Sequence, residues 1–177
     1  MRAFALAGWS GSGKTVLMTR LLPELTGRGI TVSTVKHAHH DFDVDQPGKD
    51  SWRHRQGGAT EVLVASDRRW ALMHELRGQP EPGLVELVQH MSPVDLLLVE
   101  GFKRHPMPKL EICRPSLGKA PLWAEDGSIL AVALDEPLPE DWRNRLRVPI
   151  FDLNAVPTIA DFILANAAPL ALKDGAP

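Results

Sequence analysis

Residues 3–15 read AFALAGWSGSGKT, and this stretch decides the fold. Its first five residues form a continuous apolar run, which is typical of a buried strand in a parallel sheet. The next eight residues match the pattern G-x-x-x-x-G-K-[ST] in full, and the apolar residues that follow have helical spacing. A strand, a glycine-rich loop and a helix in this order predict a loop that binds phosphate.

The residue types in this loop explain how it would hold a nucleotide. Glycines let the backbone wrap around a phosphate with several N–H groups pointing inward, at the positive end of the next helix. Lys14 would reach the β- and γ-phosphates, and the Thr15 hydroxyl would bind Mg²⁺. The predicted nucleotide-binding residues are Gly8, Trp9, Ser10, Gly11, Ser12, Gly13, Lys14 and Thr15.

A protein with such a loop also needs a carboxylate at the end of a neighbouring strand, to hold Mg²⁺ or its waters. Residues 95–100, DLLLVE, are the strongest buried-strand signal in the chain, and Gly101 allows a sharp exit after them. Asp95 lies at the far end of that strand, ~16 Å from the phosphates at strand rise. We therefore predict Lys14 and Glu100 as catalytic residues, and Thr15 and Glu100 as ligands of the metal ion.

The rest of the chain alternates between apolar runs and helix-like stretches. Pro23 predicts a kink or an early end in the first helix, and Gly27 should stop it. Two strands at 61–65 and 69–73 are joined by a tight turn. Further strands are expected at 30–35, 109–114 and 128–134, and further helices at 51–56, 84–91 and 158–168. The fold class is α/β: a mostly parallel P-loop NTPase-type sheet with helices on both faces and an antiparallel extension.

Composition narrows the class of protein. The chain has 177 residues, 20 Lys+Arg against 22 Asp+Glu, a net charge of −2 and 44% hydrophobic residues. We expect one nucleotide-binding domain over residues 1–170 with a frayed tail at 171–177. This charge balance gives no electrostatic reason to expect nucleic acid as a partner, and no window approaches the ~20 apolar residues of a membrane span. A single cysteine, Cys113, excludes an internal disulfide and favours a cytoplasmic location.

Residues 36–45, KHAHHDFDVD, concentrate three histidines and three aspartates. Imidazoles would suit a transition metal, whereas alternating aspartates favour a harder ion. A second interpretation, which we favour, is a switch-like loop beside the phosphates, with Asp41 near Mg²⁺ and cations near phosphate. A third is a polar loop in solvent. The candidate residues of the cofactor or switch loop are His37, Asp41, Asp43, Lys49 and Arg53.

With residues 35–51 added, the sequence resembles the molybdopterin-guanine dinucleotide biosynthesis protein B (MobB) family. The segments 95–103 and 108–111 continue the likeness, which spans most of residues 3–114. The resemblance implies a dimeric GTP-binding adaptor with weak GTPase activity. It would assist the guanylyltransferase that joins molybdopterin to GMP, with Mg²⁺ as cofactor and molybdopterin or its guanine dinucleotide as a further ligand. The family's phosphate loop carries over onto Gly8 to Thr15, its strand-end acid onto Glu100, and its loop near Mg²⁺ onto Asp41 and Asp43.

Other functions stay open. The chain has no N-K-x-D motif for reading guanine, so guanine is implied by the resemblance alone, and Asp135 is a positional candidate for accepting the base edge. A P-loop small-molecule kinase would need a lid of arginines, for which residues 143–147 are the candidate. A nickel metallochaperone GTPase would use His37, His39 and His40. A fourth possibility is a module that holds nucleotide without turnover.

Overall fold

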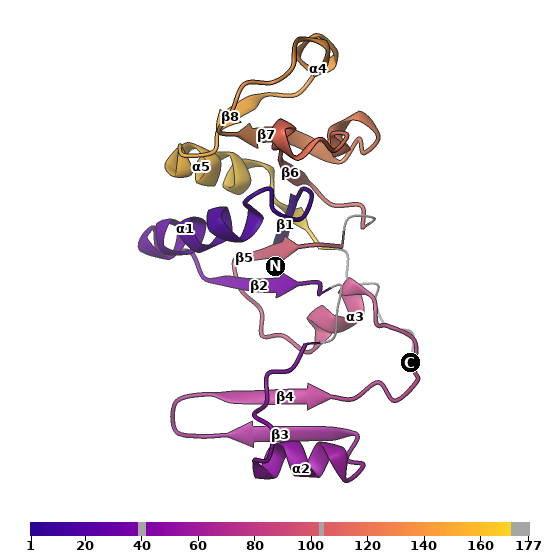
Figure 1. The fold of residues 1–177 in the computed structure, drawn as a ribbon. Helices are drawn as coiled ribbons and strands as arrows, with labels where there is room; N and C mark the ends of the chain where they lie inside the picture. Colours follow the sequence, from indigo (N-terminus) through magenta and orange to yellow (C-terminus); the bar gives the residue numbers. More distant parts are fainter. Residues whose placement is uncertain (39–41, 103–104, 171–177) are drawn as a thin grey trace. The chain divides into compact units, whose positions relative to one another are not determined.

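The computed structural model describes residues 1–38, 42–102 and 105–170 (Figure 1). It contains two compact units, and each is described by itself. The first comprises residues 1–37 and the chain from Leu84 onward, and the second comprises residues 38–83. The expectation of a single domain over residues 1–170 stays a prediction, and the frayed tail predicted at 171–177 lies outside the described residues.

The first unit is built on a parallel sheet in the order β2-β5-β1-β6-β7-β8. A short final strand pairs antiparallel with the start of β1. The strands are β1 Arg2–Ala7, β2 Val32–Lys36, β5 Leu96–Glu100, β6 Lys109–Ile112, β7 Ile129–Leu134, β8 Ile150–Asp152 and β9 Ala168–Pro169. Because the first six of these run parallel, their carboxyl ends share one edge of the sheet, where α/β folds bind ligands.

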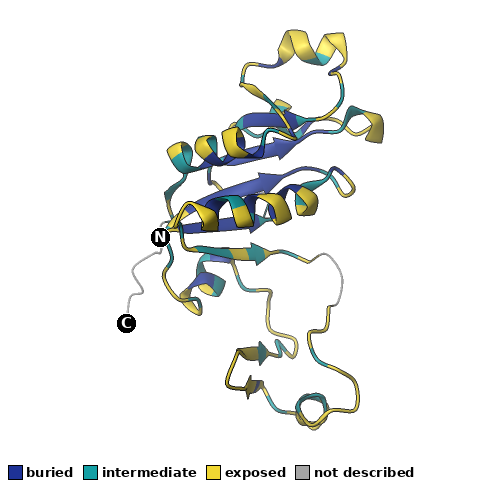
Figure 2. Ribbon diagram, turned by 90° about the vertical axis from the view of Figure 1, so that its left-hand side faces the viewer, coloured by how far each residue is buried: buried dark blue, intermediate teal, exposed yellow. Residues whose placement is uncertain are grey.

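Helices cover both faces of this sheet, as predicted. On one face, α1 (Lys14–Gly27) and α5 (Val156–Asn166) pack on Phe4 and Leu6 of β1. On the other face, α3 (Leu84–Gln89) packs on Ala3 and Ala5. Figure 2 looks onto α1 and α5, whose outer surfaces are largely exposed, with the buried strands behind them. Successive residues of β1 thus face opposite sides of the sheet, as expected for a strand that is buried on both sides. No helix among the described residues is long and apolar enough to span a bilayer.

The first helix continues through Pro23, so the predicted early end is wrong. Pro23 lies on the exposed side of α1, while Leu17, Leu21 and Leu25 are buried on the other side. A proline in a helix leaves one carbonyl of the preceding turn without its backbone donor. The carbonyl belongs to Thr19, which is an exposed residue of α1. The burial of the leucines therefore outweighs the loss of one backbone hydrogen bond. The helix ends at Gly27, where the sequence predicts a stop.

The second unit contains the antiparallel extension. Its helix α2 (Asp50–Gln56) precedes a two-stranded sheet of β3 (Glu61–Ala65) and β4 (Trp70–His74). The strands pair antiparallel with Leu63 opposite Leu72, and the backbone N–H of Ser66 donates to the Arg69 carbonyl to close the predicted turn. A sheet of two strands is marginally stable alone, so this unit depends on further contacts.

Candidate functional site

The predicted phosphate loop connects β1 to α1 at the carboxyl edge of the parallel sheet (Figure 1). The Lys14 ammonium donates to the carbonyls of Gly8 and Trp9, at 2.9 and 2.8 Å. The helix begins directly behind the loop, since the Gly13 carbonyl accepts the N–H of Leu17. The positive end of α1 and the Lys14 side chain are therefore both at the loop, as anion binding requires.

Gly8 fixes how closely this loop approaches the neighbouring strand. Its φ is 141°, and a Cβ there would lie 2.5 Å from the Ile112 carbonyl oxygen at the end of β6. The same Cβ would lie 2.7 Å from the Ser12 hydroxyl, which is buried and has no hydrogen-bond partner among the described residues. A glycine is required here because any side chain would push the loop off β6.

Thr15 and Glu100, the two predicted metal ligands, are in contact. The Thr15 hydroxyl donates to the carboxylate of Glu100, at 3.2 and 3.4 Å from its two oxygens. The Lys36 ammonium, at the end of β2, lies 3.8 Å from the same carboxylate. A hydroxyl and a carboxylate are the oxygen donors that Mg²⁺ prefers, so these residues fit the ion that the fold implies.

The chain leaves β5 through a tight turn directly after Glu100. Gly101 has a φ of 99°, and a Cβ there would lie 2.5 Å from the Cβ of His37. The N–H of His37 donates to the Glu100 carbonyl at 2.8 Å. The His37 ring packs against Phe102 in a tilted arrangement, with the ring centroids 4.8 Å apart. His37 therefore lies beside the strand-end acid through backbone pairing and ring packing, and the predicted sharp exit at Gly101 is confirmed.

An ion pair lies on the opposite side of the loop, where β6 and β7 end. The Arg114 guanidinium donates to the Asp135 carboxylate at 2.7 Å. The same guanidinium is 3.9 Å from the position that a Cβ on Gly13 would occupy. The sequence singled out Asp135 but missed Arg114. Arg114 follows a buried strand next to β1, which is the positional signal that identified Glu100.

A short segment after β6 lies against the outer side of the phosphate loop. The Trp9 indole N–H donates to the Ala120 carbonyl at 2.7 Å, and a Cβ on Gly11 would touch Leu117 at 3.7 Å. The segment contains two 3₁₀ turns, η1 (Pro115–Leu117) and η2 (Leu122–Ala124). The buried Glu111 carboxylate accepts the N–H groups of Leu122 and Trp123, which fastens this segment to β6. Burial raises the pKa of Glu111.

Asp43, one of the aspartates predicted for the switch loop, is bound within the second unit together with Asp45. Arg55 donates to Asp43 at 2.8 Å and to Asp45 at 3.3 Å, and it also donates to Glu75 at 2.8 Å. The N–H of Asp45 and the Arg55 guanidinium lower the pKa of Asp43. Asp43 and Asp45 are therefore partners of Arg55 in a local ion network.

Of the remaining candidates of this loop, Lys49 and Arg53 are described by the structure and Asp41 is not. Lys49 is the residue before α2, and the exposed Arg53 is 4.0 Å from Asp50. Asp41, His39 and His40 lie outside the described residues, so Asp41 as a magnesium ligand stays a prediction. Within residues 1–38, 42–102 and 105–170, no three His, Cys, Asp or Glu side chains gather as a metal site would require.

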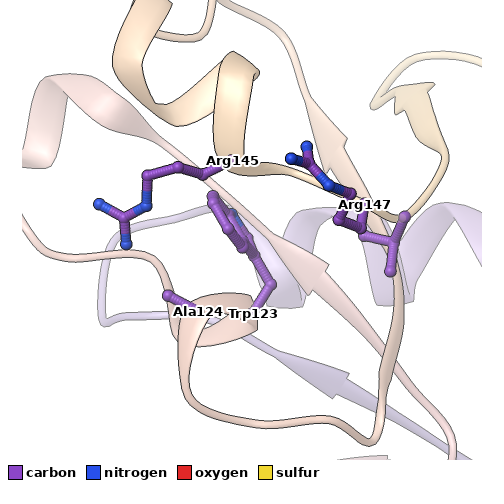
Figure 3. A pocket seen from close by; sticks show the side chains of 5 residues that line it. Trp123, Ala124, Arg145 and Arg147 are labelled. Carbon is purple, nitrogen blue, oxygen red and sulfur yellow. The ribbon is translucent and has the colours of Figure 1, made fainter.

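A separate pocket of about 390 Å³ lies near α4 (Glu140–Arg145). Figure 3 shows Arg145 and Arg147 on either side of the Trp123 ring. The lining residues are Trp123, Ala124, Arg145, Arg147 and Val148. The Arg147 guanidinium donates to the carbonyls of Asn144 and Leu146. Two of the three arginines considered as a kinase lid, Arg145 and Arg147, thus line this pocket, which gives the kinase alternative no support.

Comparisons with known proteins agree on one family. Residues 3–135 match the family model described as molybdopterin guanine dinucleotide synthesis protein B. A molybdopterin-guanine dinucleotide biosynthesis adapter protein of Haemophilus influenzae is 45% identical over 161 residues, which cover 89% of this chain and 85% of that protein. The adapter protein of the same name from Escherichia coli is 44% identical over 163 residues, 90% of each chain.

Solved structures agree with this likeness. A crystal structure of molybdopterin-guanine biosynthesis protein B superposes with a TM-score of 0.69 at 28% identity, covering 92% of this chain and 98% of the other. A MobB homologue from Bacillus stearothermophilus gives 0.68 at 26% identity, covering 93% and 99%. The α/β class with a mostly parallel sheet and an antiparallel extension is therefore confirmed.

Proposed function

Because the chain belongs to the molybdopterin guanine dinucleotide synthesis protein B family, we propose that it is a GTP-binding adapter with weak GTPase activity. In this role it assists the guanylyltransferase that converts molybdopterin to its guanine dinucleotide form. The proposal that the chain binds a nucleotide rests on the phosphate loop, in which Lys14 contacts two loop carbonyls and Thr15 contacts Glu100. The names of the relatives in Haemophilus influenzae and Escherichia coli support the adapter part.

Different residues of the site would contact the phosphates and the metal ion of a bound triphosphate. Lys14 holds two loop carbonyls in the structure described here, and exchanging them for phosphate oxygens gives a charge-assisted hydrogen bond. Thr15 and Glu100 would hold Mg²⁺, which neutralises phosphate charge when bound. Lys36 adds a cation on the Glu100 side.

Weak hydrolysis fits this set of residues. Rapid GTPases position the attacking water with a glutamine and stabilise the transition state with an arginine, which is worth about 10³–10⁵ in rate. The carboxylate of Glu100 contacts Thr15 and lies beside Lys36, which suits holding a metal better than activating water. We therefore expect slow turnover in the isolated protein and faster turnover only if a partner supplies an arginine and a group that positions the attacking water.

The proposed function is tested first by titrating the protein with GTP and ATP analogues in Mg²⁺. We expect GTP to bind at least tenfold more tightly than ATP, about 1.4 kcal/mol. Removing Mg²⁺ should weaken GTP binding in the native protein. The Glu100→Gln variant should bind GTP less tightly in Mg²⁺ and respond less to Mg²⁺ removal, because it has lost a carboxylate ligand. Calorimetry measures both effects.

A second measurement addresses the adapter role. Purified guanylyltransferase should form more guanine dinucleotide from molybdopterin when this protein and GTP are both present. Equal affinity for GTP and ATP would contradict the guanine assignment and favour a kinase. Normal GTP binding with no effect on the guanylyltransferase would contradict the adapter role.

We also propose that the protein forms a homodimer through one face of the β3–β4 sheet, with a second copy as the occupant. Leu63 and Trp70 on this face are 61% and 63% exposed, and Leu72 lies directly opposite Leu63. A two-stranded sheet with an exposed apolar face is stabilised when another apolar surface covers that face. The same face of a second copy offers such a surface, because a two-fold symmetric interface pairs identical patches.

The dimer proposal predicts the effect of one polar substitution. Leu63→Ser should weaken self-association about tenfold, because ~1–2 kcal/mol of apolar burial is lost. Light scattering or analytical ultracentrifugation over a concentration series would measure the change. Val16→Ser is the matched control, since Val16 on α1 is 62% exposed. A native protein that stays monomeric at tens of micromolar, or a Leu63→Ser variant that dimerises normally, would rule the face out.

A further inference from the structure

The chain contains no N-K-x-D motif, so guanine has to be read by other residues. Their place follows from the sheet order. Glu100 and Thr15 put the metal end of the site on the β5 side of β1. A nucleotide whose phosphates lie at the amino end of α1 then extends its nucleoside toward the other side, where β6 and β7 end.

Arg114 and Asp135 occupy that side. Each follows the end of its strand, and their side chains form an ion pair at 2.7 Å. The pair lies close to the phosphate loop, because the Arg114 guanidinium is 3.9 Å from the Cβ position of Gly13. About a third of each side chain is exposed, at 31% and 34%, so a ligand can reach both. The next carboxylate, Glu136, is engaged by the N–H of Ser116 at 2.6 Å.

The chemistry of this pair matches the Watson–Crick edge of guanine. That edge presents one acceptor, O6, followed by two donors, N1–H and the N2 amine. An arginine beside a carboxylate presents one donor followed by two acceptors, which is the complementary order. Adenine presents a donor at N6 and an acceptor at N1, so the Asp135 carboxylate would face a lone pair and the Arg114 guanidinium would face an amine.

We propose that Arg114 and Asp135 form the guanine-reading subsite, with Asp135 accepting from N1–H and the N2 amine and Arg114 donating to O6. This proposal rests on the proposed function and names the residues that would give it specificity. It also assigns Arg114 a second task, because its bond to Asp135 holds the carboxylate in the orientation that the base needs. A site built on such hydrogen bonds rejects a base that leaves them unmade.

The decisive variant is Asp135→Asn, titrated with GTP, XTP and ATP. Xanthine carries a carbonyl where guanine carries the N2 amine, and an asparagine amide offers one acceptor and one donor to that edge. We expect GTP affinity to fall about tenfold to thirtyfold, XTP affinity to rise above that of GTP, and ATP affinity to stay unchanged. Arg114→Lys should weaken GTP binding less, since the lysine ammonium can still donate to O6 although the planar guanidinium fork is lost.

Glu136→Gln is the matched control, because Glu136 is adjacent and its carboxylate serves the Ser116 N–H. It should keep the GTP-over-XTP preference. Pyrophosphate binding reports the phosphate loop without any base, and Asp135→Asn should leave it unchanged.

The outcomes separate this proposal from the proposed function. An Asp135→Asn variant that still prefers GTP over XTP would overturn the subsite while the native protein's GTP binding stood. Loss of pyrophosphate binding in that variant would also overturn it, because Asp135 would then act on the fold of the loop. Failure of the native protein to bind GTP would overturn the proposed function itself.

Discussion

Lys14→Ala is expected to weaken GTP binding about a hundredfold, the largest loss of affinity for any single side chain. Hydrogen bonds to charged groups contribute about 1.5–3 kcal/mol each, and a hundredfold loss corresponds to about 2.7 kcal/mol. Lys14 already reaches across the loop to the Gly8 and Trp9 carbonyls, so its ammonium lies where the phosphates would enter. Isothermal calorimetry with a non-hydrolysable GTP analogue measures the change.

The exposed Lys119 provides a matched control for charge. Lys119→Ala removes the same formal charge from the surface and should bind the analogue within about twofold of the native protein, because exposed charges act weakly through solvent. Comparable losses in both variants would mean that Lys14 acts only through net charge. An unaffected Lys14→Ala variant would remove the basis for a phosphate site in this loop.

Gly8→Ala is expected to lower the free energy of unfolding by about 3–5 kcal/mol. Positive-φ strain accounts for ~1–3 kcal/mol, and forcing a methyl into packed surroundings adds a comparable amount. The clash is with backbone, since the new Cβ would lie 2.5 Å from the Ile112 carbonyl oxygen. That is a large part of the 5–15 kcal/mol that stabilises a typical domain. Thermal unfolding followed by circular dichroism should show a midpoint about 10 °C lower.

Gly27→Ala is the matched substitution for this experiment. Gly27 is the last residue of α1, and a Cβ there meets nothing within 4 Å. It should leave the unfolding free energy unchanged or raise it by up to ~1 kcal/mol, since alanine loses less backbone entropy than glycine in a helix. Equal unfolding midpoints for Gly8→Ala and the native protein would contradict the prediction, because they would show that the loop accommodates the methyl group without loss of stability.

The sequence predicted the elements whose signal is local. The run at residues 95–100 predicts β5 because four consecutive apolar residues leave a strand no solvent-facing side. The phosphate loop is predicted because its glycines, lysine and threonine serve one chemical task. The contact of Thr15 with Glu100 follows from the rule that parallel strands end at a common edge.

Other features depend on contacts that no short pattern carries. The strand β8, at the edge of the sheet, has only three residues. Three residues are too few for an alternation of apolar and polar side chains to be recognised in the sequence. Arg114 stands at the end of a predicted strand, but only the pairing of β6 with β1 shows that this strand ends beside the loop. The helix through Pro23 depends on leucines buried by α5 and the sheet, a tertiary effect that outweighs local propensity.

The position of β1 in the middle of the sheet also shapes how the protein is made. Ala5 pairs with Val99 of β5 and with Lys109 of β6, so this apolar strand is synthesised long before its partners. At about 5–20 residues per second, the ribosome needs roughly 5 to 20 seconds to deliver them. During that interval the strand that carries the phosphate loop is exposed to other chains and to chaperones. Folding therefore depends on contacts distant in sequence, which slows it relative to a chain that folds through local contacts.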